Sequence, residues 1–138
     1  MSIAADPFIG GIAPLLKDTN DFRELNDEQR KVVAHDQGPL LVIAGPGSGK
    51  TRCLTLRAMN LLLLEKAEPS EIVLCIYTEK AAYEMQDRVS KIANDVGYRK
   101  GISQMRIGTI HSICSRIIKE NLHRIPNTYQ QRPHIGNN

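Results

Sequence analysis

A glycine-rich segment that ends in a lysine and a threonine offers the strongest chemistry in this sequence. Residues 44–51 read A-G-P-G-S-G-K-T, which fits the phosphate-binding pattern G-x-x-x-x-G-K-[ST] with Ala44 in the first position. Glycines let the backbone turn so that its N–H groups point at phosphate oxygens. Lys50 would then reach the β- and γ-phosphates, and the hydroxyl of Thr51 would take a position on Mg²⁺. The pattern therefore predicts a triphosphate-binding loop.

The segments on either side of this loop have the patterns that such a loop needs. Residues 39–44 read P-L-L-V-I-A, which predicts a short strand buried on both faces. From Lys50 onward, apolar residues recur at helical spacing until Pro69. A helix that begins at the loop brings its positive dipole end to bound phosphates. Because the flanking elements and the G-K-T ending agree, we favour nucleotide binding over a plain strand-to-helix turn.

A helix precedes the loop in the predicted order of elements. Asn26 can cap this helix, and Gln29, three residues later, completes a capping box. We expect the helix to run to about Asp36. Before it, residues 1–21 have no steady period and are interpreted as an irregular arm.

Strands and helices alternate after the loop helix. Residues 72–77 predict a second buried strand, and Thr78 can cap a helix that stops near Gly97. Residues 105–108 predict a weaker strand, and a further helix ends before Pro126. The apolar stripes of the two helices are Ala82, Met85, Val89, Ile92 and Val96, and Ile110, Ile113, Cys114, Ile117, Ile118 and Leu122.

This order, one helix followed by three strand–helix units, predicts an α/β fold with a parallel sheet and helices on its faces. Residues 22–125 form the expected domain, and residues 126–138, rich in Asn, Gln and Pro, form a loose tail. The chain has 138 residues, which is the size of one domain.

Composition excludes several classes of protein. Three cysteines without a C-x-x-C pair exclude a disulfide framework and a thiolate zinc site. No apolar run is long enough to cross a membrane, so we expect a cytoplasmic protein without a membrane partner. Seven basic residues and one acidic residue fall in residues 98–138, a balance that attracts polyanions unless the segment is only a solvated tail.

Four sequence blocks resemble the N-terminal ATP-binding region of Rep/UvrD/PcrA-type DNA helicases of superfamily 1. They occur in the family's order and lie within residues 22–120. The blocks are L-N-D-E-Q-R at residues 25–30, A-G-P-G-S-G-K-T-R at 44–52, Y-T-E-K-A-A-Y-E-M at 77–85 and G-T-I-H-S-I-C at 108–114.

The resemblance implies a P-loop NTPase (RecA-like) fold, three-layered α/β/α and here incomplete, with ATP and Mg²⁺ as cofactors. The resemblance implies that Gln29 contacts the edge of the adenine base. Glu79 stands where the family has Asn. The implied nucleotide-binding residues are Gln29, Ala44, Gly45, Pro46, Gly47, Ser48, Gly49, Lys50, Thr51 and Arg52, and the implied single-stranded DNA contacts are Tyr77, Thr78, Lys80, His111 and Ser112.

The sequence contains no apolar strand that ends in Asp-Glu, the carboxylate pair with which P-loop ATPases hold Mg²⁺ and activate water. By resemblance, we expect the N-terminal piece of an ATP-dependent 3′-5′ DNA helicase, inactive alone, whose partners are single-stranded DNA, a duplex junction and the rest of the helicase chain. An unpaired sheet edge would favour self-association.

Three alternatives remain open at this stage. One is a stand-alone nucleotide-binding regulatory module without hydrolysis, and a second is a small P-loop kinase. The third, a thiol nucleophile formed by His111 and Cys114, is disfavoured because the helical phase places Cys114 in the core.

Overall fold

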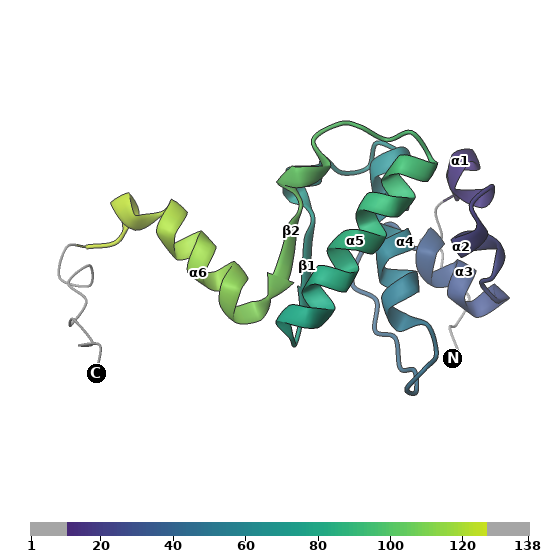
Figure 1. Ribbon diagram of the computed structural model, residues 1–138, viewed down its shortest axis with the longest axis horizontal. Helices are drawn as coiled ribbons and strands as arrows, with labels where there is room; N and C mark the ends of the chain where they lie inside the picture. The colour runs from purple at the N-terminus through teal and green to yellow at the C-terminus, as the bar shows by residue number, and fades with distance from the viewer. Residues whose placement is uncertain (1–10, 127–138) are drawn as a thin grey trace.

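The structure, a computed structural model, describes residues 11–126 and combines helices with a small parallel sheet (Figure 1). The predicted tail beyond residue 126 lies outside the described residues. No helix within residues 11–126 is long and apolar enough to span a membrane. Short 3₁₀ turns lie at Pro69–Glu71, Ile102–Gln104 and Leu122–Arg124. The helices are α1 (Pro14–Lys17), α2 (Asn20–Arg23), α3 (Asp27–Ala34), α4 (Lys50–Leu63), α5 (Glu79–Asp95) and α6 (Ile110–Glu120), and the strands are β1 (Val73–Ile76) and β2 (Arg106–Thr109).

The helices α3, α4 and α5 pack together beside the sheet. The predicted start of α3 is confirmed, since Asn26 caps the helix and Gln29 completes the capping box. The predicted cap of α5 is also confirmed, since the Thr78 hydroxyl accepts a hydrogen bond from the N–H of Ala81 at 3.2 Å. The whole predicted stripe of α5 is buried: Ala82, Met85, Val89, Ile92 and Val96.

The N-terminal segment differs from the irregular arm expected for residues 1–21. Its described part contains α1 and α2, and the Thr19 hydroxyl caps α2 by accepting a hydrogen bond from the N–H of Phe22. Leu16 and Phe22 are buried in the core. These two apolar side chains, too far apart for a regular period, hold the segment against the helices.

A fully buried asparagine on α4 fixes the same segment. The Oδ1 atom of Asn60 accepts a hydrogen bond from the N–H of Ala13 at 2.8 Å. Its Nδ2 atom donates to the carbonyls of Gly11 at 3.0 Å and Val33 at 3.3 Å. One side chain therefore joins α4, the end of α3 and the N-terminal segment.

The sheet has two strands in the described residues, where the sequence predicted three. Residues 39–45 have no regular secondary structure and form no strand, which corrects the prediction for 39–44. Leu40 and Val42 pack against the core, whereas Leu41 and Ile43 are 84% and 80% exposed. The apolar run was interpreted as buried on both faces, but a strand requires a neighbour to pair with.

The parallel strands β1 and β2 are buried on one face. Leu74 pairs in register with Ile107, and both side chains are buried. Val73 and Cys75 point to the other face and are exposed, which corrects the prediction of a fully buried strand.

The last helix, α6, extends away from the rest of the described chain (Figure 1). Of its residues, all of which are described, Ile113 alone is buried. Cys114 is exposed, so the prediction that it lies in the core is wrong. The reason is that few neighbouring side chains reach the apolar stripe of α6. An ion pair of 2.7 Å between Arg106 and Glu120 joins its far end to β2.

Candidate nucleotide-binding site

The glycine-rich segment forms a tight loop that leads directly into α4. Gly47 and Gly49 have φ angles of 72° and 77°, in the left-handed region that side chains other than glycine rarely adopt. The N–H of Ser48 donates to the carbonyl of Gly45 at 3.3 Å, which closes the turn. Lys50 is the first residue of α4. The free N–H groups of the first helical turn therefore face the loop, as an anion site requires.

The Lys50 ammonium lies within the loop and is held by its backbone. Its Nζ atom donates to the carbonyls of Ala44 and Gly45, each at 3.0 Å. The Oγ atom of Ser48 is buried without a hydrogen-bond partner in the described residues. A phosphate group could accept hydrogen bonds from both side chains, because the Lys50 ammonium has a third N–H beyond these two bonds and the Ser48 hydroxyl is a donor without a partner.

Gln29 joins the start of α3 to the loop. Its Oε1 atom accepts a hydrogen bond from the N–H of Asn26 at 2.9 Å, and its Nε2 atom donates to the carbonyl of Ser48 at 2.8 Å. A Cβ atom at Gly49 would lie 3.2 Å from this Nε2 atom, so a side chain at position 49 would crowd Gln29. Sequence reasoning placed Gln29 at the nucleotide, and the structure places it against the loop.

A cavity of about 730 Å³ lies over the loop and contains most of the predicted residues. Pro46 is not among its lining residues. Glu24, Asn26 and Arg88 were not predicted for this site. The capping box that Asn26 shares with Gln29 was a local signal for Asn26, whereas no local pattern connects Glu24 and Arg88 to the loop. The lining residues are Glu24, Asn26, Gln29, Ala44, Gly45, Gly47, Ser48, Gly49, Lys50, Thr51, Arg52 and Arg88.

The charges of this cavity fit an anionic ligand. Lys50, Arg52 and Arg88 are cationic, whereas Glu24 is the one carboxylate among the lining residues, and it pairs with Arg52 at 2.9 Å. The net positive charge, the buried Ser48 hydroxyl and the helix N-terminus fit the phosphates of ATP. Thr51 supplies a hydroxyl in the lining that fits a Mg²⁺ ion bound mainly by phosphates and water.

A second cavity, of about 340 Å³, lies where β1 and β2 end. Tyr77, which is 92% exposed, and His111 both line it, so the structure brings together these two predicted DNA contacts. The Thr109 hydroxyl donates to Oε1 of Glu79 at 3.3 Å, and this bond joins the two sequence blocks. The arrangement follows from the parallel register, because both strands end at the same edge.

The other predicted DNA contacts lie differently. The Thr78 hydroxyl caps α5, and the Ser112 hydroxyl donates to the carbonyl of Thr109 at 2.9 Å. Both hydroxyls therefore have local structural roles. Lys80 is outside the second cavity, with its side chain 88% exposed and its Nζ atom 4.0 Å from Glu84.

Comparison with known proteins identifies the family. The UvrD/REP helicase N-terminal domain matches residues 25–135. A probable DNA helicase II homolog of Rickettsia conorii is 41% identical over 101 residues, which cover 73% of this chain and 14% of that protein. The ATP-dependent DNA helicase PcrA of Staphylococcus aureus is 40% identical over 104 residues, which cover 75% of this chain and 14% of that protein. DNA helicase II of Rickettsia typhi is 36% identical over 110 residues, which cover 80% of this chain and 16% of that protein. The chain spans 14–16% of the length of these curated relatives, and it belongs to the UvrD/REP helicase N-terminal domain family.

Proposed function

We propose that this chain is the N-terminal ATP-binding part of an ATP-dependent DNA helicase with a P-loop NTPase (RecA-like) fold. The observation that carries the proposal is the loop itself, with its left-handed Gly47 and Gly49, and Lys50 at the start of α4. Membership of the UvrD/REP family supports it. The segment of residues 39–45, which leads into the loop and has no regular secondary structure here, would become a strand beside further strands of a three-layer α/β/α domain.

The proposed roles in ATP binding follow from the cavity. Lys50 exchanges its bonds to loop carbonyls for the β- and γ-phosphates, and the backbone of the loop surrounds them. The Thr51 hydroxyl would hold a Mg²⁺ ion, which would supply positive charge to neutralise the phosphates. Gln29 contacts the adenine, and Arg52 and Arg88 add positive charge to the wall.

We propose that the second cavity contacts single-stranded DNA. Tyr77 offers an exposed aromatic ring on which a base can stack, and His111 in the cavity and the exposed Lys80 outside it offer polar groups to the DNA backbone. Helix α5 begins at this edge, and Arg88 on the same helix lines the nucleotide cavity. A single rigid helix therefore reaches both proposed sites.

Hydrolysis, 3′-5′ movement and duplex separation are proposed for the complete helicase, since this chain spans a small part of its relatives. We expect the chain alone to bind ATP without turning it over, because its residues show no Asp-Glu strand end. Self-association through an unpaired sheet edge stays a prediction, as does a cytoplasmic location.

Nucleotide titration of the chain and of Lys50→Ala tests the proposal. We expect a fluorescent ATP analogue to bind the unaltered chain and to bind Lys50→Ala about 100-fold more weakly, because a charge-assisted contact to phosphate is lost. Lys17→Ala, which removes an exposed lysine of α1, is the matched control and should bind as the unaltered chain does. Equal binding by Lys50→Ala would contradict the proposed site. Phosphate release with and without single-stranded DNA measures turnover, and helicase-like rates would contradict the proposed inactivity.

A further inference from the structure

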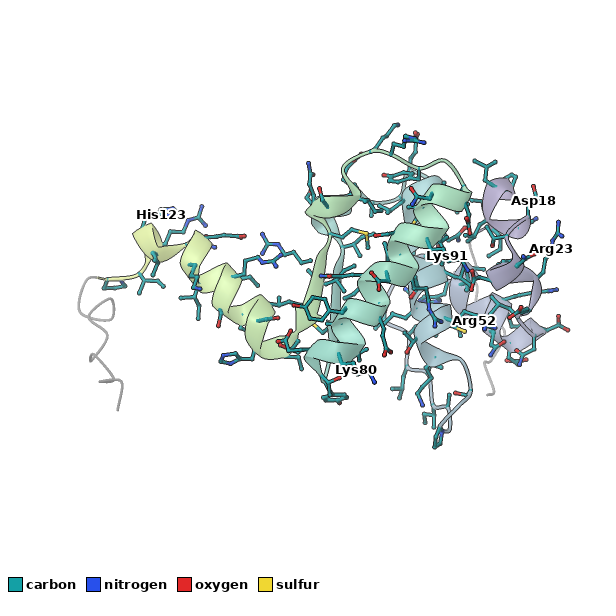
Figure 2. The ribbon with its side chains drawn as sticks, in the orientation of Figure 1. Asp18, Arg23, Arg52, Lys80, Lys91 and His123 are labelled. Carbon is teal, nitrogen blue, oxygen red and sulfur yellow. The ribbon has the colours of Figure 1, made fainter. Side chains whose placement is uncertain are left out.

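Arg52 lies in the first turn of α4, directly after the loop, and its side chain forms ion pairs with the N-terminal helices. Its Nη1 atom lies 2.9 Å from Oε2 of Glu24, and its Nε atom lies 3.9 Å from Oδ1 of Asp21. Figure 2 shows Arg52 between α5 and these helices. A guanidinium so near a phosphate-binding loop is strongly attracted to phosphate oxygens. The two carboxylates oppose that attraction.

These carboxylates stand on a firmly packed element. Asp21 belongs to α2, Glu24 is its C-cap, and Phe22 between them is buried. The Asp21 side chain is 19% exposed, and its Oδ2 atom lies 3.9 Å from Nζ of Lys91 on α5. Asp21 is therefore held between cations of α4 and α5. This network fixes geometry more than it adds stability, since partly exposed ion pairs contribute little free energy.

The two carboxylates do not satisfy every hydrogen-bond donor of the Arg52 guanidinium. Its Nε atom is buried without a hydrogen bond in the part of the chain that the structure describes. Arg52 lines the nucleotide cavity together with Glu24 and Gln29. Asp21 and Glu24 precede residue 25, where the match to the helicase family begins, so the shared family segment does not include them.

We propose that Asp21 and Glu24 are positioning residues that hold Arg52 at the cavity wall beside Gln29, so that it contacts the nucleoside and not the phosphates. The inference rests on the proposed ATP site. With both carboxylates present, the cavity favours a complete nucleoside triphosphate over a bare polyphosphate. Without them, Arg52 swings to the phosphates, and the preference for the nucleoside decreases.

The test compares ATP and inorganic tripolyphosphate as competitors of a fluorescent nucleotide. For Asp21→Asn/Glu24→Gln, we expect tripolyphosphate to bind more tightly and the ratio of ATP affinity to tripolyphosphate affinity to fall about tenfold. Adding Arg52→Ala to the double variant and to the unaltered chain completes a mutant cycle. In the Arg52→Ala background, removing the two carboxylates should leave the ratio unchanged.

Asp18→Asn is the matched control. It removes one negative charge from the same segment, but Asp18 pairs with Arg23 at 3.8 Å and does not line the cavity (Figure 2). Its ratio should equal that of the unaltered chain. A loss of fold would weaken the binding of ATP and of tripolyphosphate together. Loss of the positioning of Arg52 would instead change the ratio of the two affinities. An unchanged ratio in the double variant would overturn this inference and leave the proposed function standing. A change in the ratio that persists with Arg52→Ala would do the same. Failure of the unaltered chain to bind either nucleotide overturns the proposed function and this inference with it.

Discussion

Helices α4 and α6 each begin at a candidate site, yet they lie in opposite environments. α4 buries Cys53, Thr55, Leu56, Ala58, Met59, Asn60 and Leu62, two of which are polar side chains. α6 has the cleaner apolar stripe and buries Ile113 alone among its residues, all of which are described. α4 has α3 and α5 as neighbours, whereas α6 extends away from them (Figure 1). An apolar stripe therefore predicts which face a helix can bury, and neighbouring elements decide whether it does.

The largest expected effect comes from removing the hydrogen bonds of Asn60 on α4. Asn60→Leu keeps the size of the side chain but leaves backbone groups of Ala13, Gly11 and Val33 without their partner. We expect the free energy of unfolding to fall by about 4 kcal/mol, since each buried group left unpaired costs about 1–3 kcal/mol. Urea denaturation measures this change. A loss below about 1 kcal/mol would contradict the role of Asn60 as the joint between these elements.

A matched pair of truncations compares the two helices directly. Leu56 on α4 is fully buried, whereas Ile118 on α6 is 50% exposed. We expect Leu56→Ala to lower the free energy of unfolding by about 3 kcal/mol, through lost burial and a cavity. Ile118→Ala should change it by about 0.5 kcal/mol or less. Thermal and urea unfolding of both variants check the difference, and similar losses would show that α6 is packed as well as α4.

The reactivity of two cysteines compares α4 with α6 without a mutation. Burial raises the pKa of the Cys53 thiol on α4, although Arg52 nearby lowers it, whereas Cys114 on α6 is exposed. At neutral pH we expect Cys114 to react with iodoacetamide at least about tenfold faster than Cys53. Peptide mapping after timed labelling measures both rates, and the urea-denatured chain, where the rates should converge, is the control. Faster labelling of Cys53 would contradict its burial.

The raised pKa of Cys53 also gives stability a pH dependence. The folded state holds the thiol proton more tightly than the unfolded chain does, so the contribution to stability is complete below the ordinary thiol pKa. It is lost as the pH rises through the higher pKa of the folded state. Cys53→Ser should reduce this alkaline loss of unfolding free energy, which urea titrations at several pH values measure. An identical pH profile in the variant would contradict a contribution from the Cys53 thiol.

The smallest expected effect concerns the ion pair between α6 and β2. Arg106 and Glu120 are 30% and 45% exposed, so water and salt screen their attraction. We expect Arg106→Ala to lower the free energy of unfolding by about 0.5 kcal/mol. Limited proteolysis should cut the variant sooner within α6, where the pair holds the helix end. Unchanged cleavage would show that this ion pair does not hold the end of α6.

The parts of the fold that sequence reasoning predicted are governed by local chemistry. The capping box of Asn26 and Gln29 and the cap at Thr78 depend on residues within one helical turn, so their patterns were readable. The buried stripe of α5 followed from its period because α4 lies beside it. The prediction for residues 39–44 failed, because their strand requires a partner that no local pattern reveals.

Some residues of the candidate site could be predicted from local sequence, and others could not. The loop residues are contiguous, so their pattern was visible in the sequence. Arg88 and Glu24 enter the cavity from α5 and the end of α2, where tertiary packing alone places them. The caps formed by Thr78 and Thr109 explain why polar residues recur at the strand ends apart from any contact with DNA.

The double hydrogen bonding of Gln29 has a thermodynamic consequence for the loop. A glycine-rich loop ordinarily loses much conformational entropy when it wraps around an anion. The bond from Nε2 of Gln29 to the carbonyl of Ser48 pins the middle of this loop to a capped helix. Part of that entropy is therefore lost during folding, and the loop meets its ligand already preorganised.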